Sequence, residues 1–277
     1  MLRSLFGERS RKELVTAQYG TALAASDYAR AMDESGPRSR YYKSRLRLIQ
    51  DLLTAHPGGD LLDAGCGPGV MVRTLLASRP RDFRITALDQ SPAMVAHCLT
   101  SAREAGGEIC PAVGQLEAMP LADASFDVTL VMGALEYVNA RAALNEIARV
   151  TRPGGLAIVT MLNPLSPYRL TEWFLYWPLL RVRDAVRKPP GTPGNCRYGV
   201  RASGIRAFPP GRLQQLMRQA SLQPADLIHF DVTPFLPPLD ALPRMVAMAE
   251  QTAHERTVSR SWRRWLGTAY LVAARRL

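Results

Sequence analysis

Cysteine is scarce in this sequence, and long apolar runs are missing from it. Its 277 residues include four cysteines, too few for a disulfide framework. They form no Cys-x-x-Cys pair, and none lies at metal-ligand spacing from a histidine. No window reaches the roughly 18–20 uninterrupted apolar residues that a membrane-spanning helix needs. Residues 1–9 have no apolar stretch of signal-peptide length. We therefore expect a cytoplasmic protein with free thiols.

The composition predicts a folded protein with a sizeable core and an uneven charge. Apolar residues make up 47% of the chain and charged residues 21%, which excludes a disordered or fibrous polymer. Residues 1–178 contain 19 basic and 18 acidic side chains, whereas residues 179–277 contain 16 and 6. The basic field therefore belongs to the C-terminal third, and any anionic partner is to be sought there. The alternative is a solvated surface rich in arginine, since 32 of the 35 basic residues are Arg.

Short apolar runs alternate with helical patterns in the first 160 residues. The runs predict strands at residues 60–64, 84–89, 109–113, 127–132 and 156–161, and helical spacing lies between them at 70–77, 92–104 and 140–150. Strands that are apolar throughout and joined by helices indicate a mainly parallel sheet covered on both faces. We expect a doubly wound α/β domain that binds its ligand at the carboxyl edge of the sheet.

Two insertions and an N-terminal cap complete the expected organisation. Residues 1–57 are predicted to be a helical cap, with Tyr42, Leu46, Ile49 and Leu53 at helical spacing. Residues 58–277 would form the core, interrupted at about 163–210 and 234–264. The first insertion is punctuated by proline and has an aromatic cluster at 173–177. A helix at 211–222, strands at 225–232 and 267–274, and a helix near 239–254 are also predicted.

A glycine-rich turn between the first strand and the next helix is the strongest site signal. Gly65, Gly67 and Gly69 are spaced G-x-G-x-G, and Asp63 precedes them. A dinucleotide turn has the spacing G-x-G-x-x-G, and a carboxylate beside it would repel a diphosphate but suit an ammonium group. Asp89 ends the second strand, 22 residues after Gly67, where an acidic side chain accepts hydrogen bonds from ribose hydroxyls. The alternative role for Asp89 is to stabilise the N-terminus of the helix that follows it.

At these residues the sequence resembles the class I S-adenosylmethionine-dependent methyltransferases. The resemblance rests on four segments in order, residues 61–69, 87–94, 114–127 and 144–155. It is greatest to the branch that contains quinone-biosynthesis and natural-product methyltransferases. The resemblance implies a Rossmann-like sheet of seven mostly parallel strands with helices on both faces, and S-adenosylmethionine as the cofactor.

The resemblance also implies which residues bind the cofactor. Asp63, Gly65 and Gly67 would face the methionine part of the cofactor, and Asp89 the ribose. Gln90 and Met94 would contact the adenosine, and Gln115 and Leu116 would bracket the adenine. Gly133 would line the pocket near the sulfonium. One position departs from the family, because Gln115 stands where the family usually has Asp. An amide oxygen still accepts a hydrogen bond from the adenine amine, but without charge assistance.

The sequence does not assign a catalytic residue. A general base is needed only when the methyl acceptor is a neutral hydroxyl or a carbon acid. Glu136 and Tyr137 follow the fourth strand and are candidates for placing the acceptor, whereas His229 is expected to be a packed histidine. Glu136 and Asn163 alone do not form a metal cluster, so no metal is expected.

The expected acceptor is a hydrophobic small molecule such as a polyketide, a quinone or a lipid-like compound. The aromatic residues of 168–182 and four tyrosines of the cap would form its pocket (Tyr19, Tyr28, Tyr41 and Tyr42). Segment 168–188 is also a candidate for peripheral contact with the inner face of the membrane.

Two alternative functions remain open. One is a nucleic-acid methyltransferase, disfavoured because no Asn/Asp-Pro-Pro-aromatic segment follows the fourth strand. The other is a non-catalytic partner subunit that binds the cofactor. Oligomeric state is not predicted.

Overall fold

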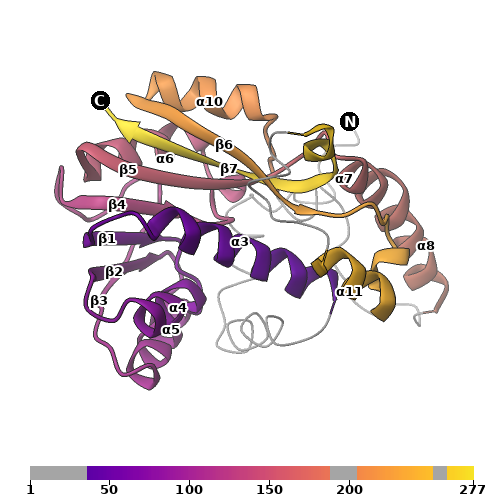
Figure 1. The fold of residues 1–277 in the computed structure, drawn as a ribbon, viewed down its shortest axis with the longest axis horizontal. Helices are drawn as coiled ribbons and strands as arrows, with labels where there is room; N and C mark the ends of the chain where they lie inside the picture. Colours follow the sequence, from indigo (N-terminus) through magenta and orange to yellow (C-terminus); the bar gives the residue numbers. More distant parts are fainter. Residues whose placement is uncertain (1–35, 188–204, 252–260) are drawn as a thin grey trace, which may run out of the picture.

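The computed structural model describes residues 36–187, 205–251 and 261–277. Their strands form one seven-stranded sheet in the order β3-β2-β1-β4-β5-β7-β6 (Figure 1). Strands β1 to β5 are parallel, and β7 runs antiparallel between β5 and β6. This confirms the predicted mostly parallel sheet. The strand bounds are β1 Gly59–Ala64, β2 Phe83–Asp89, β3 Cys110–Val113, β4 Phe126–Val131, β5 Thr151–Leu162, β6 Leu222–Val232 and β7 Gly267–Arg276.

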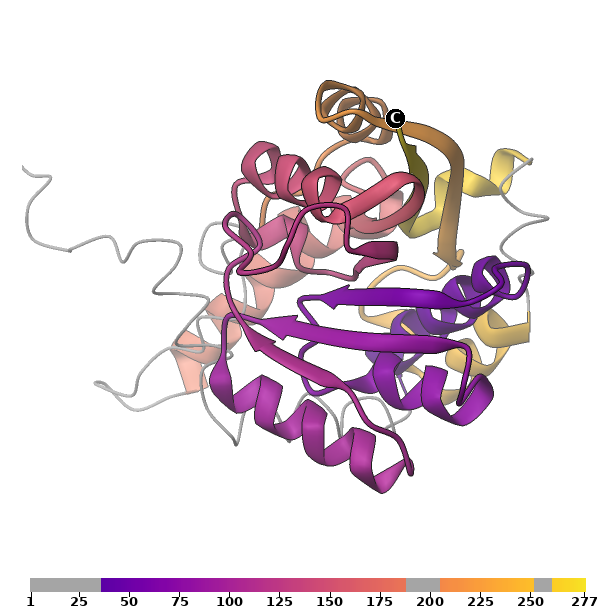
Figure 2. The same cartoon turned by 90° about the vertical axis from the view of Figure 1, so that its left-hand side faces the viewer.

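Helices cover both faces of the sheet, and each face has its own apolar core. Helices α3 (Pro37–Leu53), α4 (Val70–Ser78) and α5 (Pro92–Glu104) pack on one face, and α6 (Ala140–Val150) and α10 (Pro210–Gln219) pack on the other (Figure 2). The predicted starts of α5 and α6 are confirmed by their caps. Ser91 Oγ accepts the Met94 N–H at 3.3 Å, and Asn139 Oδ1 accepts the Ala142 N–H at 3.3 Å.

Two local expectations need correction. The strand predicted at 156–161 begins earlier, at Thr151, and its pairing with β4 is irregular between the pairs Phe126–Thr151 and Val128–Leu156. On α3, the buried face is rotated from the predicted one. Leu48, Ile49 and Leu53 are buried, but Tyr42 and Leu46 are only half-buried, and two arginines take part of the buried face (Arg40 and Arg45).

The insertions form helices at one end of the sheet (Figure 1). After β5 follow α7 (Pro167–Thr171), the short π-helix η2 (Glu172–Tyr176) and α8 (Trp177–Arg187). After β6 follow η3 (Leu239–Ala241), α11 (Pro243–Gln251) and η4 (Trp262–Leu266). The predicted insertion limits remain predictions, because residues 188–204 and 252–260 lie outside the described residues, as do residues 1–35 of the expected cap.

Buried polar contacts join α3 to the last two strands and join the two insertions to each other. Arg40 Nε donates to Asp231 Oδ1 at 2.7 Å, and Thr268 Oγ1 of β7 donates to the other oxygen of Asp231. Nearby, Tyr168 of α7 donates its hydroxyl to Asp240 Oδ2 of η3 at 2.6 Å. These pairs are buried. The position of α3, and of the cavity side chains that it carries, is therefore set by contacts with distant parts of the chain.

Candidate functional site

A cavity of about 1000 Å³, part of it open to solvent, lies where β1, β2 and β4 end. Parallel strands bring the residues after their carboxyl ends to this edge. Seven of the nine residues predicted to bind the cofactor line the cavity: Gly65, Gly67, Asp89, Gln90, Met94, Leu116 and Gly133. The other two are Asp63, which is fully buried, and Gln115, which is exposed.

The glycine-rich turn presents bare backbone to the cavity. Gly65 has a φ of +83°, and a Cβ there would lie 2.6 Å from the Ala134 Cβ, so only glycine fits. Gly67 has a φ of +52°, and no heavy atom lies within 4 Å of the place its Cβ would take. The N–H groups of Gly65 and Cys66 both donate to the Leu88 carbonyl of β2, at 2.7 and 3.0 Å. The turn is thus held to the neighbouring strand while its open side faces the cavity.

Two carboxylates accompany this turn, the buried Asp63 and the half-buried Asp89. Neither oxygen of Asp63 has a hydrogen-bond partner in the described part of the chain, and burial raises the pKa of this carboxyl to about 7. Asp89 Oδ2 accepts the Gly67 N–H at 3.0 Å, and its Oδ1 accepts the Ser91 N–H at 2.9 Å. Burial also raises the pKa of Asp89. Asp89 therefore does hold the N-terminal end of α5; its expected contact with a ribose remains a prediction.

Met94 and Leu116 form a buried apolar part of the cavity, with Gln90 beside them. Gln115 is exposed and outside the cavity lining, and its backbone forms a short bridge with Ala118. The contact between the Gln115 amide and adenine that the family pattern implies thus stays a prediction.

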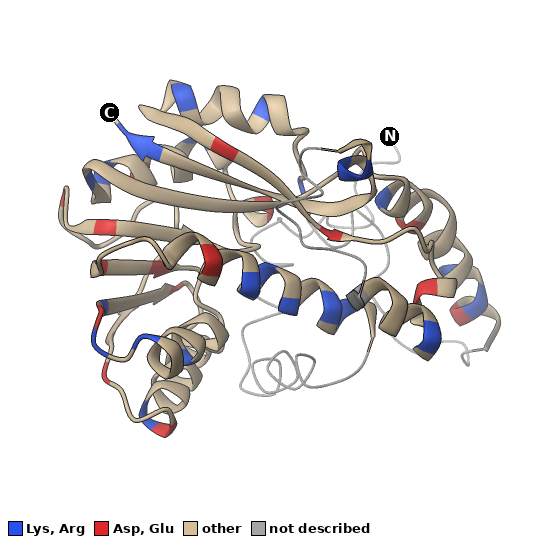
Figure 3. Cartoon of the chain, viewed as in Figure 1, with Lys and Arg blue, Asp and Glu red and all other residues tan. Residues whose placement is uncertain are grey.

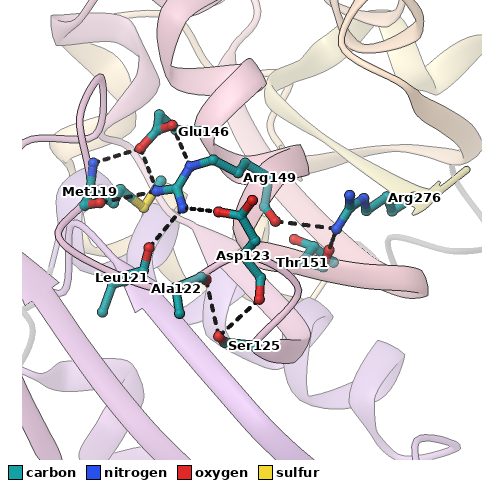
Figure 4. A network of polar contacts seen from close by, with 9 residues as sticks. All are labelled: Met119, Leu121, Ala122, Asp123, Ser125, Glu146, Arg149, Thr151 and Arg276. Carbon is teal, nitrogen blue, oxygen red and sulfur yellow. Dashed lines mark hydrogen bonds and ion pairs between the residues drawn. The ribbon is translucent and has the colours of Figure 1, made fainter.

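Arg149 of α6 holds the loop that carries Leu116 (Figure 4). Its guanidinium donates to the carbonyls of Met119 and Leu121, at 3.0 and 2.7 Å, and to Asp123 Oδ1 at 2.6 Å. Glu146 accepts from Arg149 and, at 2.7 Å, from the Met119 N–H. This cluster joins two of the segments on which the family resemblance rests. It fixes the loop without touching the cavity.

Arg45 is a cavity residue that the sequence did not single out. Its guanidinium lies 5.2 Å from the ring centres of Tyr41 and of Tyr42, and a Cβ on Gly133 would come within 2.7 Å of its Nη1. The side chain is buried, and its charge partly offsets the burial that raises the pKa of Asp63 and of another buried acid, Glu136. The sequence could have indicated this position, because Arg45 lies four residues before Ile49 and helical spacing therefore places it on the predicted apolar face.

Glu136 and Tyr137, two residues singled out as acceptor-placing candidates, line the cavity beside Val138 and Leu162. Glu136 Oε1 accepts the Leu162 N–H at 3.1 Å, and desolvation raises the pKa of this buried carboxyl. His229, expected to be a packed histidine, is outside the cavity lining, and burial lowers its pKa to about 4, so it is neutral near pH 7.

The aromatic cluster expected to roof the acceptor pocket does not line this cavity (Trp173, Phe174, Tyr176 and Trp177). Of the four cap tyrosines, Tyr41 and Tyr42 do line it, and Tyr19 and Tyr28 lie outside the described residues. In the described ranges, His, Cys, Asp and Glu side chains do not gather in groups of three suited to a metal ion.

Residues 62–159 match the protein family described as a methyltransferase domain. Over 153 residues the chain is 33% identical to malonyl-acyl carrier protein O-methyltransferase of Serratia marcescens, covering 54% of this chain and 53% of that protein. Over 178 residues it is 34% identical to demethylmenaquinone methyltransferase of Mycobacterium marinum, covering 62% and 69%. The chain thus spans about half the length of the malonyl-acyl carrier protein O-methyltransferases that it matches.

A solved structure shows the same fold at low sequence identity. Phosphoethanolamine N-methyltransferase 2 of Haemonchus contortus, in complex with phosphomonomethylethanolamine and S-adenosylhomocysteine, superposes with a TM-score of 0.64 at 14% identity. The superposition covers 96% of this chain and 60% of that one.

Proposed function

The chain belongs to the class I S-adenosylmethionine-dependent methyltransferases, and we propose that it methylates a hydrophobic small-molecule acceptor such as a polyketide, a quinone or a lipid-like compound. The supporting observation is a cavity with two unlike walls. The cofactor wall consists of the glycine turn with Asp89, Gln90, Met94 and Leu116, above the buried Asp63. The acceptor wall consists of Tyr41, Tyr42, Tyr137, Val138 and Leu162.

The cofactor wall suits a cationic nucleoside. An unpartnered, buried carboxylate is costly, and an ammonium group that donates to Asp63 would relieve that cost. Asp89 retains acceptor capacity on both oxygens beyond its two backbone bonds, which suits ribose hydroxyls. Two nearby carboxylates would repel the diphosphate of a dinucleotide. Arg45, close to Asp63, is placed to bind a carboxylate of the same ligand.

S-adenosylmethionine, when bound, supplies an electrophilic methyl group on a sulfonium. The chain's own contribution is to position the acceptor and to exclude water. Leu162 and Val138 provide apolar surface on the acceptor wall, and the tyrosine rings add area with a polar tip. Such a lining favours a flat or aliphatic acceptor with few charges.

Glu136 is our candidate for accepting a proton when the acceptor is a hydroxyl compound. It lines the cavity next to the acceptor wall, and its backbone and Oε1 are fixed by the Arg206 N–H and the Leu162 N–H. Because burial raises its pKa, the ionised carboxylate is a stronger base than an exposed glutamate. No base is needed if the acceptor is an amine.

The acceptor wall favours a small apolar molecule over a nucleic acid. Among the described residues that line the cavity, Arg45 is the basic one, and it is buried. A nucleic-acid strand is bound through several exposed Lys or Arg side chains and stacking aromatics.

The test begins with calorimetric binding of S-adenosylmethionine and of a nicotinamide dinucleotide. Binding of the first ligand alone is expected. Gly67→Ala would place a methyl group in the open side of the turn and is expected to weaken binding more than about tenfold. Gly106→Ala is the matched control, because Gly106 also has a positive φ (+75°) and open space but lies outside the cavity.

Dinucleotide binding, or equal loss of affinity in both glycine variants, would contradict the cofactor assignment. Incubation with methyl-labelled cofactor and a cell extract then identifies the product. An apolar labelled compound supports the acceptor assignment. A labelled nucleic acid refutes it, and cofactor binding with no labelled product supports the non-catalytic alternative.

A further inference from the structure

The helical segment after β5 presents an apolar face to solvent. Five side chains share this face and are 57–81% exposed; we call them the Phe174 face (Phe174, Leu175, Leu179, Val182 and Val186). Phe174 and Leu175 are adjacent, and the other three follow at steps of four, three and four residues, which places all five on one side of η2 and α8. Large contiguous apolar patches of this kind mark interaction sites in folded proteins.

The opposite side of the same segment is packed on the protein. Leu180 is buried, the rings of Trp173 and Trp177 lie 6.5 Å apart, and the indole nitrogen of Trp173 is buried. Tyr168 and Arg169, one turn earlier, bind Asp240 and the Thr268 carbonyl. The exposure of the Phe174 face therefore does not arise from a detached helix. The helix is apolar on both sides, and only one side is covered.

Arginines border the Phe174 face. At about 100° per residue, Arg181 and Arg183 fall on either side of it, and both are exposed. Segment 165–188 contains five basic and two acidic residues, and both acids are paired with arginines of the same segment: Glu172 with Arg169 at 2.5 Å and Asp184 with Arg183 at 2.8 Å. Figure 3 shows basic and acidic residues along the helical segment after β5, at one end of the molecule. A partner whose charge complements this face would be anionic.

We propose that the Phe174 face binds the surface of an anionic lipid bilayer, with the helix lying in the interface. Apolar side chains would enter the acyl boundary, and the bordering arginines would reach the phosphates. In the part of the chain that the structure describes, no helix has the length and apolar character to cross a bilayer. A symmetric dimer through this face is less favourable, because it would bring arginine borders of like charge together. The proposal is independent of the methyltransferase activity.

The test is flotation of the full chain with vesicles of phosphatidylcholine alone and of phosphatidylcholine with about 30% phosphatidylglycerol. We expect binding only to the second kind, weakened when salt is raised from about 0.05 to about 0.5 M. All four tryptophans lie in η2, α8 and η4, so a blue shift of their emission gives a second readout.

Two pairs of variants locate the contact. Leu179→Ser with Val182→Ser is expected to weaken vesicle binding at least tenfold, whereas Val113→Ser, an exposed valine on β3, leaves it unchanged. Arg181→Glu is expected to weaken binding several-fold, whereas Arg218→Glu on α10, with the same change of charge, is not. Thermal unfolding and S-adenosylmethionine binding are measured on the same samples and are expected to be unchanged.

Three results would overturn the proposal. They are equal flotation with both vesicle types, equal losses in the test and control variants, and a dimer that Leu179→Ser dissociates while vesicle binding is absent. The last result would assign the Phe174 face to a second copy of the chain. If the unmodified protein binds vesicles as expected but does not bind S-adenosylmethionine, the result counts against the proposed function alone.

Discussion

The cofactor wall and the acceptor wall differ in how the chain builds them. Each part of the cofactor wall comes from a short segment at the end of a parallel strand: the turn after β1, residues 89–94 at the end of β2 and the start of α5, and Leu116 shortly after β3. The acceptor wall joins α3, η1 (Leu135–Tyr137) and the end of β5, which are far apart in sequence. Its geometry depends on the Arg40–Asp231 pair and other long-range contacts that hold α3.

This difference separates what is constant in such a fold from what can vary. Local turns with positive φ and fixed backbone hydrogen bonds allow little change in sequence or shape, so they suit a ligand that does not vary. A wall made of side chains from separate elements can change its shape while the turns stay as they are. If the comparison is correct, substitutions on one wall should leave the function of the other intact.

The largest expected effect is that of Glu136→Gln on turnover. With a hydroxyl acceptor, kcat should fall by about 10²- to 10⁴-fold, because an amide cannot accept the proton. The affinity for S-adenosylmethionine should stay within about twofold of the wild type. The glutamine carbonyl can still accept the Leu162 N–H, so the fold is kept.

Glu117→Gln is the matched control for this variant. Glu117 also accepts a backbone N–H, that of Asn139 at 2.9 Å, but it does not line the cavity. Unchanged kcat in Glu136→Gln would remove Glu136 from the reaction. A joint loss of kcat and cofactor affinity would show that the walls are not separable.

Asp63→Asn tests the cofactor wall and should weaken S-adenosylmethionine binding about 100-fold, close to 3 kcal/mol, because the charge-assisted hydrogen bond to the ammonium is lost. Calorimetry measures the change. Asn is isosteric with Asp, so the buried position keeps its packing. A loss of less than about threefold would mean that Asp63 does not contact the ligand.

The raised pKa of Asp63 adds a pH dependence with a definite sign. With a pKa of about 7 in the free protein, the carboxyl is mostly ionised at pH 7.5 and mostly protonated at pH 6. The protonated acid has no charge to attract an ammonium, so affinity should fall about eightfold as pH falls across this range. The remaining affinity of Asp63→Asn should be nearly flat over the same range. An equal slope in both proteins would assign the titration to another group.

The sequence predicted the sheet and most of the cofactor wall for the same physical reason. Strand periodicity and cap residues are local, and Asp89 and Met94 lie within a few residues of the end of β2. Arg45 was missed because its role depends on where α3 crosses the sheet edge. The aromatic cluster around Trp173 was expected to roof the pocket, but a helix with apolar residues on two opposite sides does not reveal which of them packs.

Arg149→Met should have the smallest effect on cofactor affinity, and for that reason it tests the cofactor wall most finely. The substitution removes the bonds to Met119, Leu121 and Asp123, so the loop of Leu116 loosens, yet no ligand contact is deleted. We expect an affinity loss of about threefold, on the order of 0.6 kcal/mol, with a lower Tm. Arg84→Met is the control, since Arg84 pairs with Asp60 on the exposed surface, and its loss should leave both quantities unchanged. If Arg149→Met instead matches the 100-fold loss expected of Asp63→Asn, the cofactor wall is not a set of independent local turns. A cluster outside the cavity would then hold the cofactor wall together, as the Arg40–Asp231 pair does for the acceptor wall.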